Sequence, residues 1–548
     1  MLLVLPLRAA EPIIDVLSSE LQRNFKVLKE KGDPAPYFLA FEVTEQDSAV
    51  VSASLGALAA NSQSRSRNLD VSIRVGSPQL DNYHRTGRDR LQFTFGSAMS
   101  LDDDPAAIKR QVWFDTDRAY RLAAERLIRI RTDSQVKVAR EDSSDEFSKE
   151  EPRADLAAAA GPVRDFSRDA WAGRLRKLSA RFASYPGILV SNVTVHALEE
   201  SKYFVSSEGA RLRHGRGFYR ITITASARAD DGMDLVTAES FEASDAAGLP
   251  SDDRIATAVD KVAKELTGLL RAPMVDPYVG PAILSGRAAG VFFHEIFGHR
   301  VEGHRQKDET EGQTFTKSVG QPVLPDFLSV IFDPTRKKAA GSDLNGAYRY
   351  DDEGIAARPV TVVDKGILKT FLMSRSPIRG FDQSNGHGRR QVGAEVVSRQ
   401  SNLIVESTRQ VPDARLRQML VEEVKKQHKP YGLFFQDITG GFTNTGRGGI
   451  QAFKVIPLVV YRVYADGRPD ELVRGADIVG TPLSSFSKIL ATSDRPDAFN
   501  GYCGAESGSV PVAAVSPALL VSEIEIEKKA KSQERPPLLP APSSGEAQ

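Results

Sequence analysis

Cysteine is almost absent from this chain: Cys503 is the only one among 548 residues. One cysteine cannot form a disulfide within the chain, so the sequence contains no covalent cross-link and does not reveal the redox state of its compartment. A lone thiol is most often a small buried apolar group. A functional role for Cys503 therefore needs a second observation.

An excess of either charge is also absent, because 72 basic residues balance 72 acidic ones. A neutral chain gives no global electrostatic argument for binding nucleic acid or an anionic membrane. No run approaches the ~18 to 20 consecutive apolar residues that span a bilayer. We therefore expect neither a nucleic-acid partner nor a membrane partner.

The first residues, MLLVLPLRAAEP, lack the basic start and the length of a complete signal peptide. They look like the second half of one. We expect a cytoplasmic protein, and the alternative is an exported one if the true start codon lies upstream.

The N-terminal half shows helical and strand-like patterns in turn. A helical apolar stripe covers residues 12–31, and alternating runs such as 37–43 and 217–226 are typical of antiparallel strands. These patterns predict an α+β domain over residues 1–275, with helices on an antiparallel or mixed sheet. Between about 140 and 162 the chain is charged and poor in large apolar residues, which predicts a flexible excursion.

The C-terminal half is richer in glycine and in short strand-like runs. This pattern predicts a mostly antiparallel β domain over residues 276–528 that carries one central helix. The Pro/Ser-rich tail, residues 529–548, is expected to be disordered. The overall fold class expected is α+β.

Three of the eight histidines lie in one short segment, VFFHEIFGHRVEGH, residues 291–304. His294, Glu295 and His299 form an H-E-x-x-x-H pattern. In the familiar H-E-x-x-H pattern the two histidines share one face of a helix, whereas a spacing of five turns the second ring roughly 140° away. Both rings can reach one metal only if the helix breaks or bulges, and Gly298 is where the backbone can do so.

Spacing alone leaves two interpretations open. The His-Glu pair is either part of a metal site or a satisfied polar cluster at the end of an apolar helix, and the pattern favours neither.

Five stretches together resemble the TldD/PmbA family, also called modulators of DNA gyrase, and specifically its catalytic TldD-like branch. They are HEIFGHRVEG (294–303), DDEG (351–354), DKGILKTFLMSR (364–375), NGHGRR (385–390) and YCGAESGSVPV (502–512). The resemblance covers residues 275–528 in order, and extends faintly to SSEGA at 206–210.

The resemblance implies a zinc metalloprotease that hydrolyses peptide bonds in peptides or unfolded protein segments. It implies that His294, His299 and Cys503 bind one zinc ion per chain and that Glu295 is the catalytic residue. It also implies a dimer, formed with an identical or a related subunit, that encloses a cavity for its substrate.

Two imidazoles and one thiolate leave the fourth position of a tetrahedral zinc site for water, as in catalytic and not structural sites. Zinc lowers the pKa of bound water from ~15.7 towards neutrality, and Glu295 is expected to take the proton and deliver it to the leaving amine.

The chain departs from the family pattern at three places. His304 stands where the family often has an acid, which leaves open whether it is a further ligand. The glycine-rich stretch 439–449 is expanded, which puts the substrate preference in doubt. Residues 505–507 (AES) differ from the usual basic, polar and glycine residues beside the ligand cysteine.

Weaker candidates have two interpretations each. The acidic turn 351–353 either orients a ligand histidine or faces solvent. Arg389 and Arg390 either hold a peptide carboxylate or form surface ion pairs. For the whole chain, the alternative to a protease is a non-catalytic binding or scaffold subunit of a TldD/PmbA-type complex. A direct action on DNA gyrase has no support from the balanced charge.

Overall fold

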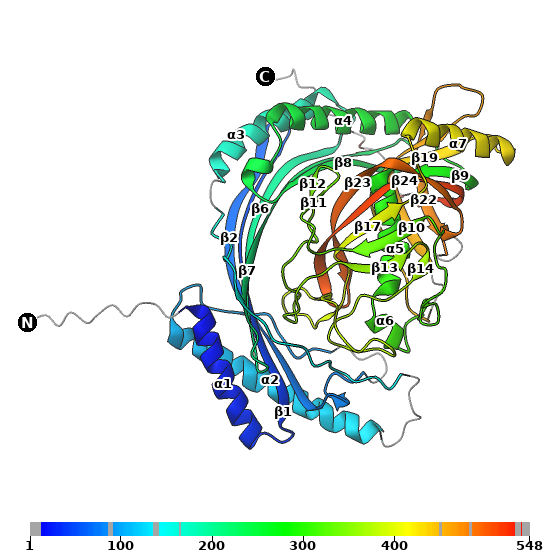
Figure 1. Ribbon diagram of the computed structural model, residues 1–548. Helices are drawn as coiled ribbons and strands as arrows, with labels where there is room; N and C mark the ends of the chain where they lie inside the picture. The colour runs from blue at the N-terminus through cyan, green and yellow to red at the C-terminus, as the bar shows by residue number, and fades with distance from the viewer. Residues whose placement is uncertain are drawn as a thin grey trace, which may run out of the picture.

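Two large β-sheets, one from each half of the chain, dominate the computed structural model (Figure 1). The described residues are 12–85, 91–134, 142–163, 166–448, 452–481, 485–531, 537 and 539. The apolar start at 1–11 and most of the tail at 529–548 therefore lie outside them. Helices pack on both sheets, and the predicted α+β fold class is confirmed.

The N-terminal sheet has eight strands over the described residues, in the order β3-β2-β1-β6-β7, with β5 and β8 both paired to β7 and β4 to β2. Its strands are β1 (Pro36–Ser54), β2 (Ala57–Ser77), β3 (Leu80–Asp81), β4 (Ser97–Ala98), β5 (Ala154–Leu156), β6 (Val190–Ser206), β7 (Arg211–Arg228) and β8 (Asp234–Ala243). The sequence pattern indicated two separate strands at 37–43 and 50–55, but β1 is continuous. Its polar middle stays in the ladder because Glu45 pairs with Arg67 on β2.

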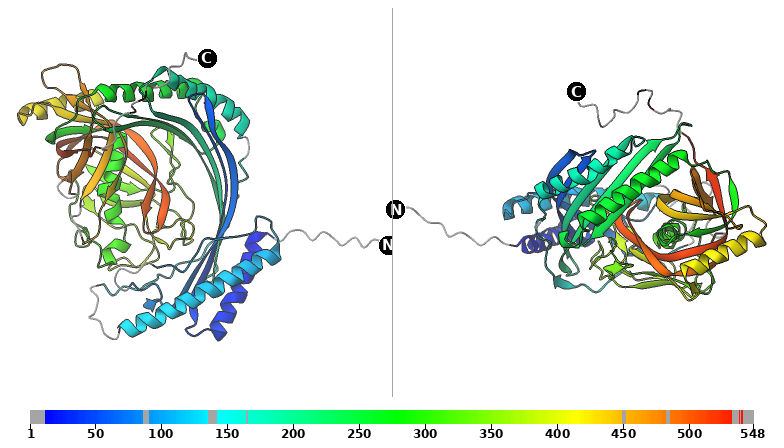
Figure 2. Two further views of the ribbon diagram at one scale, coloured as in Figure 1. Left: turned by 180° about the vertical axis from the view of Figure 1, so that it is seen from behind. Right: turned by 90° about the horizontal axis from the view of Figure 1, so that it is seen from above.

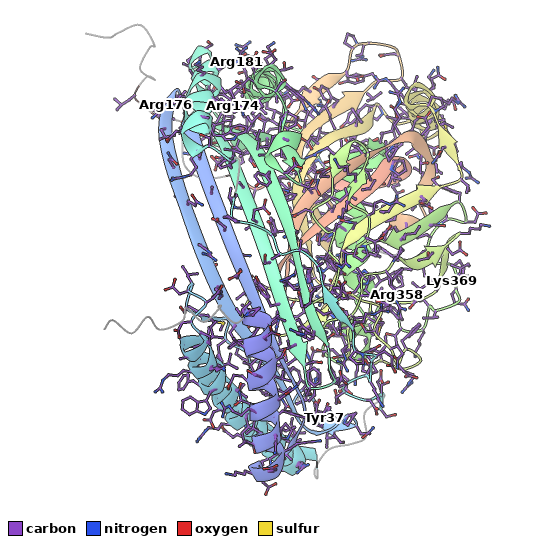
Figure 3. The ribbon with its side chains drawn as sticks, turned by 60° about the vertical axis from the view of Figure 1, so that its left-hand side comes forward. Tyr37, Arg174, Arg176, Arg181, Arg358 and Lys369 are labelled. Atoms are coloured by element: carbon purple, nitrogen blue, oxygen red, sulfur yellow. The ribbon has the colours of Figure 1, made fainter. Side chains whose placement is uncertain are left out.

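Helices cover the two ends of these long strands (Figure 1). They are α1 (Ile13–Lys31), α2 (Pro105–Ser134), α3 (Arg168–Ser179) with the 3-10 turn η1 (Ala180–Ser184), the short 3-10 turn η2 (Ala246–Gly248), and α4 (Asp252–Arg271). α1 and α2 enclose one apolar core against β1 and β2, and α3 and α4 enclose another against β6 to β8. At the outer surface, Arg174 donates to Asp252 of α4 at 2.7 Å and Arg181 pairs with Asp260 (Figure 3).

Residues 142–163, within the stretch expected to be a flexible excursion, take part in the packing. Phe147 is 5% exposed, and its ring lies 4.8 Å from that of Phe38. β5 adds to the sheet beside β7. One aromatic side chain and a few main-chain pairings thus order a segment whose composition is mostly polar.

The C-terminal sheet has twelve strands over the described residues, in the order β14-β13-β10-β17-β24-β22-β20-β19-β9, and a further β9–β24 pairing closes part of it into a ring. Its strands are β9 (Tyr278–Leu284), β10 (Leu328–Phe332), β13 (Val360–Asp364), β14 (Ile367–Leu368), β17 (Asn402–Ser407), β18 (Gln410–Val411), β19 (Gly432–Thr443), β20 (Phe453–Val463), β21 (Glu471–Val473), β22 (Ala476–Gly480), β23 (Ile489–Ala505) and β24 (Gly508–Lys528). Two small hairpins, β11 (Lys338–Ala339) with β12 (Ser342–Asp343) and β15 (Gly388–Arg389) with β16 (Val397–Ser398), lie outside this sheet. Most pairings are antiparallel, as predicted.

Helix α5 (Gly286–Ile296) lies inside this ring, where it is seen end-on in green in the right view of Figure 2. Every residue of α5 is buried except Arg287 and His294. The predicted buried run leading into His294 is therefore confirmed. After α5 come the 3-10 turn η3 (Gly298–Val301) and the short α6 (His304–Lys307), and α7 (Asp413–Lys426) packs on the outside of the ring. Within the described residues, no helix has the length and apolar character needed to cross a membrane.

The long N-terminal strands curve around the C-terminal sheet (Figures 1 and 2), and buried ions join the two. Lys202 of β6 forms ion pairs with Asp352 of the C-terminal half and, at 3.5 Å, with Glu42 of β1. Glu42 also lies 3.5 Å from Arg390. Burial lowers the pKa of Lys202, but Asp352 and Glu42 outweigh it and raise this pKa above its ordinary value.

Replacing Lys202 with methionine is expected to lower the free energy of unfolding by about 3 kcal/mol, because it leaves buried carboxylates without their cation. The measurement is the urea concentration at half-unfolding. The control is Lys261→Met, which removes a half-exposed lysine paired with Glu239 at 2.6 Å and should cost under about 1 kcal/mol. Equal midpoints for the two variants would show that the buried cluster does not stabilise the fold.

Candidate metal centre

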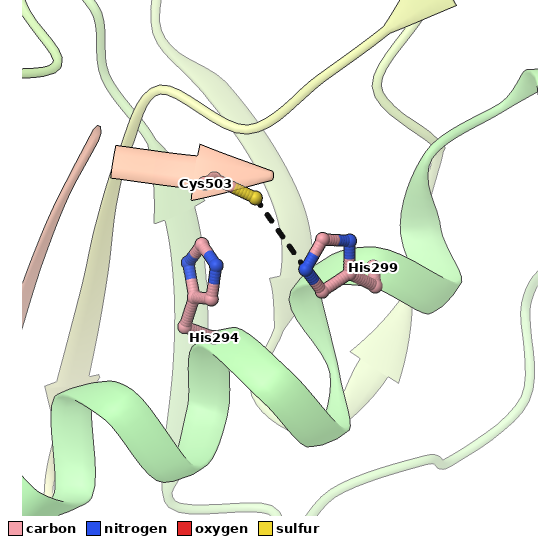
Figure 4. A group of neighbouring side chains, drawn as sticks. All are labelled: His294, His299 and Cys503. Carbon is pink, nitrogen blue, oxygen red and sulfur yellow. Dashed lines mark hydrogen bonds between the residues drawn. The ribbon is translucent and has the colours of Figure 1, made fainter. Parts of the chain in front are cut away.

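Three side chains with metal-binding atoms meet at the end of α5. His294 lies in the last turn of this helix, His299 in η3, and Cys503 on β23 (Figure 4). Their ligand atoms lie within 4.8 Å of one another, and the Cys503 Sγ is 3.4 Å from the His299 Nε2. In the described part of the chain, this is the one group of three or more such residues with that spacing.

The predicted break in the helix is confirmed. α5 ends at Ile296, and the tighter η3 begins at Gly298. This break brings the ring centroid of His299 to 5.1 Å from that of His294, although the two residues are five apart in sequence. The reason for glycine differs from the expected one, since Gly298 does not have positive φ. A Cβ atom there would lie 1.9 Å from the Gln400 Oε1, so Gly298 is required for space.

Cys503 lies within a strand, and its expected location in a turn is wrong. β23 and β24 pair without interruption from Pro496 to Ala505, with Cys503 opposite Val510, and the chain reverses only after Ala505. The flanking glycines suggested a turn, but the thiol packs with Val510 and Val512, and this apolar contact favours the strand. The strand fixes the direction in which Sγ points.

Glu302 holds the orientation of His299. Its Oε2 lies 3.3 Å from the His299 Nδ1, which leaves Nε2 directed towards Cys503. Arg305 donates to the same oxygen at 2.8 Å, and Arg399 lies 3.4 Å from the other. Burial would raise the pKa of Glu302, but His299 and Arg305 outweigh it and lower this pKa to about 2.

The role of Glu302 was missed in the sequence, although its position three residues after His299 was a usable signal. A carboxylate on the second nitrogen of a ligand histidine is the usual way to fix its orientation. The acidic turn 351–353, which was considered for this role, does something else. Asp351 and Asp352 accept from the main-chain N–H groups of Gly388 and Arg390 at 2.9 and 2.7 Å. They are buried and do not face solvent.

Arg399 and Gln400 support the site from the loop before β17. Arg399 donates to the carbonyl of Cys503 at 2.5 Å, and Gln400 donates to the carbonyl of His294 at 3.3 Å. These two neighbours therefore connect the ligand strand to the ligand helix. No spacing in the sequence connects them with the histidines, because the contacts cross about a hundred residues of chain.

The charges of the site favour the thiolate form of Cys503. Burial alone would raise the pKa of this thiol, but the imidazoles of His299 and His294 hold it well below its ordinary value. Burial likewise lowers the pKa of His299, and Cys503 and Glu302 raise it well above the ordinary value. The thiolate is the form of cysteine that binds metals.

The donor set fits zinc. Two imidazole nitrogens and one thiolate sulfur are ligands that zinc accepts, and three protein ligands are typical of a catalytic site. His304, which was left open as a further ligand, pairs instead with Glu506. The unusual Glu506 thus occupies the side chain of the unusual histidine.

Glu295 lies beside the three ligands, in a cleft of about 400 Å³ that His294 also lines. Burial raises the pKa of Glu295, although His294 and His299 act to lower it. One wall of the cleft is the stretch 437–441 of β19, and the opposite wall includes Thr222 and Thr224 of β7. The cleft therefore lies between the two sheets.

Comparison with known proteins gives matches for the C-terminal half. Residues 278–528 match the family described as the PmbA/TldA metallopeptidase C-terminal domain. A metalloprotease of Methanocaldococcus jannaschii is 30% identical over 233 residues, which are 42% of this chain and 47% of that protein. A zinc metalloprotease TldD homolog of Saccharolobus solfataricus is 26% identical over 248 residues, 45% of this chain and 51% of that protein. The matches span about half the length of these relatives.

The fold also has a counterpart among solved structures. The crystal structure of TldE from Thermococcus kodakarensis aligns with a TM-score of 0.61 at 13% identity, covering 92% of this chain and 99% of that one. At this identity the likeness shows that the two chains share a fold.

Proposed function

Since residues 278–528 belong to the PmbA/TldD metallopeptidase family, we propose that the chain is a zinc-dependent protease acting on peptides or unfolded protein segments. The observation that carries this proposal is the convergence of His294, His299 and Cys503 beside Glu295, inside a cleft. A buried polar cluster without a ligand would not require a preformed thiolate next to two imidazoles.

The three ligands would hold the ion, and Glu302, Arg399 and Gln400 keep them in position. When bound, zinc lowers the pKa of water towards neutrality and polarises a carbonyl. The Glu295 carboxylate follows ligand His294 directly and faces the same cleft, so it is placed to accept a proton from the attacking water. The same carboxyl group then donates the proton to the leaving amine nitrogen.

An extended peptide can be held by the main chain of β19. The pairing of β9 with this strand covers only Leu433 to Phe435, whereas the cleft begins at Asp437. At Gly441 a Cβ atom would lie 2.8 Å from the Glu295 Cγ, so the absence of a side chain keeps the approach to the carboxylate open. Strand addition at such an edge binds a peptide through its main chain and tolerates many sequences.

The position of the cleft between two sheets favours an extended chain over a folded domain as substrate. We also propose that the protein works as a dimer, with a second copy or with a related subunit. The structural likeness to TldE supports a pairing of two chains that share this fold.

The expected result is that protein loaded with about one zinc per chain digests casein, and that a chelator stops the reaction. A stable folded domain should resist digestion, while its unfolded form should not, because only an extended chain fits between the sheets. Products are followed by electrophoresis, and zinc by elemental analysis. Failure to bind added zinc, or rapid digestion of the folded domain, would contradict the proposal.

A further inference from the structure

A second cavity, of about 960 Å³, lies next to the catalytic cleft between the same two sheets. Tyr502 lines both spaces, and β7 passes along both, with His214 and Arg216 at the second cavity and Thr222 at the cleft. This volume is in the range of sites that bind a small ligand or part of a larger one. One extended peptide can therefore reach from the cleft into this cavity.

Most cations that line the second cavity are paired with acids. Lys202 pairs with Asp352, and Arg216 pairs with Glu200 at 3.1 Å. Arg390, the second arginine of the NGHGRR stretch, lies 3.5 Å from Glu42 and 4.0 Å from Asp70. These groups have internal partners and do not call for a ligand.

Arg389 is the exception. It is 6% exposed, and no acid in the described part of the chain forms an ion pair with it. Its Nη1 donates to the carbonyls of Gln400 and Pro511, both at 2.7 Å. Its Nε and Nη2 groups donate no hydrogen bond to any described residue. Neither of the two sequence interpretations, a surface ion pair or a free surface cation, describes this residue.

The guanidinium of Arg389 is held rigidly. Two carbonyls fix one nitrogen, and the group lies over the ring of Tyr348 at 4.7 Å from its centroid. Tyr348 is fixed in turn by donating to the carbonyl of Gly386 at 2.7 Å. Arginine does not lose its charge in proteins, and a buried charge without a partner is costly. A rigid, charged and unpaired fork is the arrangement expected of a binding group for an anion.

Arg389 is also close to the metal ligands. The Pro511 carbonyl that it holds belongs to the residue paired with Tyr502, and the next pair along the hairpin is Cys503 with Val510. The Gln400 carbonyl belongs to the residue whose side chain bonds to the carbonyl of His294. The cavity therefore starts within one residue pair of the ligand thiol.

We propose that this cavity binds a carboxylate of the peptide substrate through the Nε and Nη2 edge of Arg389. The carboxylate is either the C-terminal group of the peptide or an acidic side chain. A guanidinium edge matches a planar carboxylate with two parallel hydrogen bonds. One unpaired positive charge balances one carboxylate, whereas a phosphate would bring a second negative charge into a cavity whose other cations are paired. The proposal rests on the proposed function, because it names what the protease recognises in its substrate.

The test uses one fluorescent peptide in three forms: a free C-terminal acid, a C-terminal amide, and an amide with one glutamate near its end. Binding is measured by fluorescence anisotropy to the zinc-loaded Glu295→Gln protein. We expect the free acid or the glutamate form to bind about 10- to 100-fold more tightly than the plain amide, the range for hydrogen bonds to a charged group. The form that gains identifies the source of the carboxylate.

Arg389→Met should remove this preference, and Arg389→Lys should keep only part of it, because lysine retains the charge but not the fork. The control is Arg358→Met, which removes an exposed arginine that bonds to the Ser384 carbonyl outside the cavity. Melting temperature and zinc content show whether each variant is folded, and the lysine variant decides the question if the methionine variant is not.

Equal binding of all three peptides by folded protein would overturn the carboxylate site. Cleavage of those peptides by the wild type would still support the protease. Conversely, an Arg389-dependent preference without any cleavage would support the site and contradict the proposed function.

Discussion

Replacing Glu295 with glutamine is expected to lower the turnover of casein by about 10²- to 10⁴-fold, the usual contribution of a general acid-base group. Glutamine has nearly the same shape, so the close contact with Gly441 and the neighbouring ligands should be preserved. Zinc content and peptide affinity should therefore change little. Steady-state cleavage, anisotropy of a labelled peptide and elemental analysis measure the three quantities separately.

The matched control is Glu265→Gln. Glu265 on α4 is also a carboxyl group whose pKa burial raises, but it bonds to Gln436 and does not line the cleft. This variant should keep wild-type turnover. Equal cleavage by wild type and the Glu295→Gln protein would remove the reason to regard the chain as a protease. It would favour the scaffold alternative, since a scaffold function depends on surfaces remote from the metal.

Periodicity predicted the elements that local sequence determines. The apolar stripe at 12–31 is α1, and the alternating run at 217–226 lies within β7. Periodicity failed where a distant partner decides the outcome. The polar middle of β1 looked like a connection between two strands, but Arg67 of β2 and the ladder with β6 keep it extended. Phe147 gave no periodic signal because it is a single anchor.

The candidate site divides in the same way. His294, Glu295, His299 and the break near Gly298 were visible because they lie in one segment. The association of Cys503 with them came from resemblance alone, since no local pattern connects positions two hundred residues apart. Arg399 and Gln400 had no signal at all. Their function depends on a loop that packs between α5 and β23, and only the three-dimensional structure brings it there.

The balanced charge of the chain also concealed a strongly charged interior. Several arginines of the C-terminal half are buried, among them Arg300, Arg375 and Arg399. Arg375, for example, makes two hydrogen bonds to Glu208 of the N-terminal half, at 2.7 and 2.9 Å. Such pairs cancel in a count of charges, so composition excludes a basic surface but says nothing of where the ions lie.

Replacing Cys503 with serine is expected to weaken zinc binding by on the order of 100-fold or more. Four-ligand sites in small peptides bind zinc with about 10 to 16 kcal/mol, or about 3 kcal/mol for each ligand. A serine hydroxyl remains protonated near neutral pH and is a poor substitute for a thiolate. Zinc affinity is measured by competition with a chromogenic chelator.

The fold should tolerate this change, because serine is close to cysteine in size and the bond from Arg399 goes to the main-chain carbonyl of Cys503. The urea midpoint should therefore move much less than the zinc affinity. Cys503→Ala provides the matched comparison: if the thiolate is the ligand, alanine and serine should lose zinc to a similar degree. Retention of zinc by both variants would show that the third ligand is a different residue, and the geometry around His294 and His299 would then need another partner.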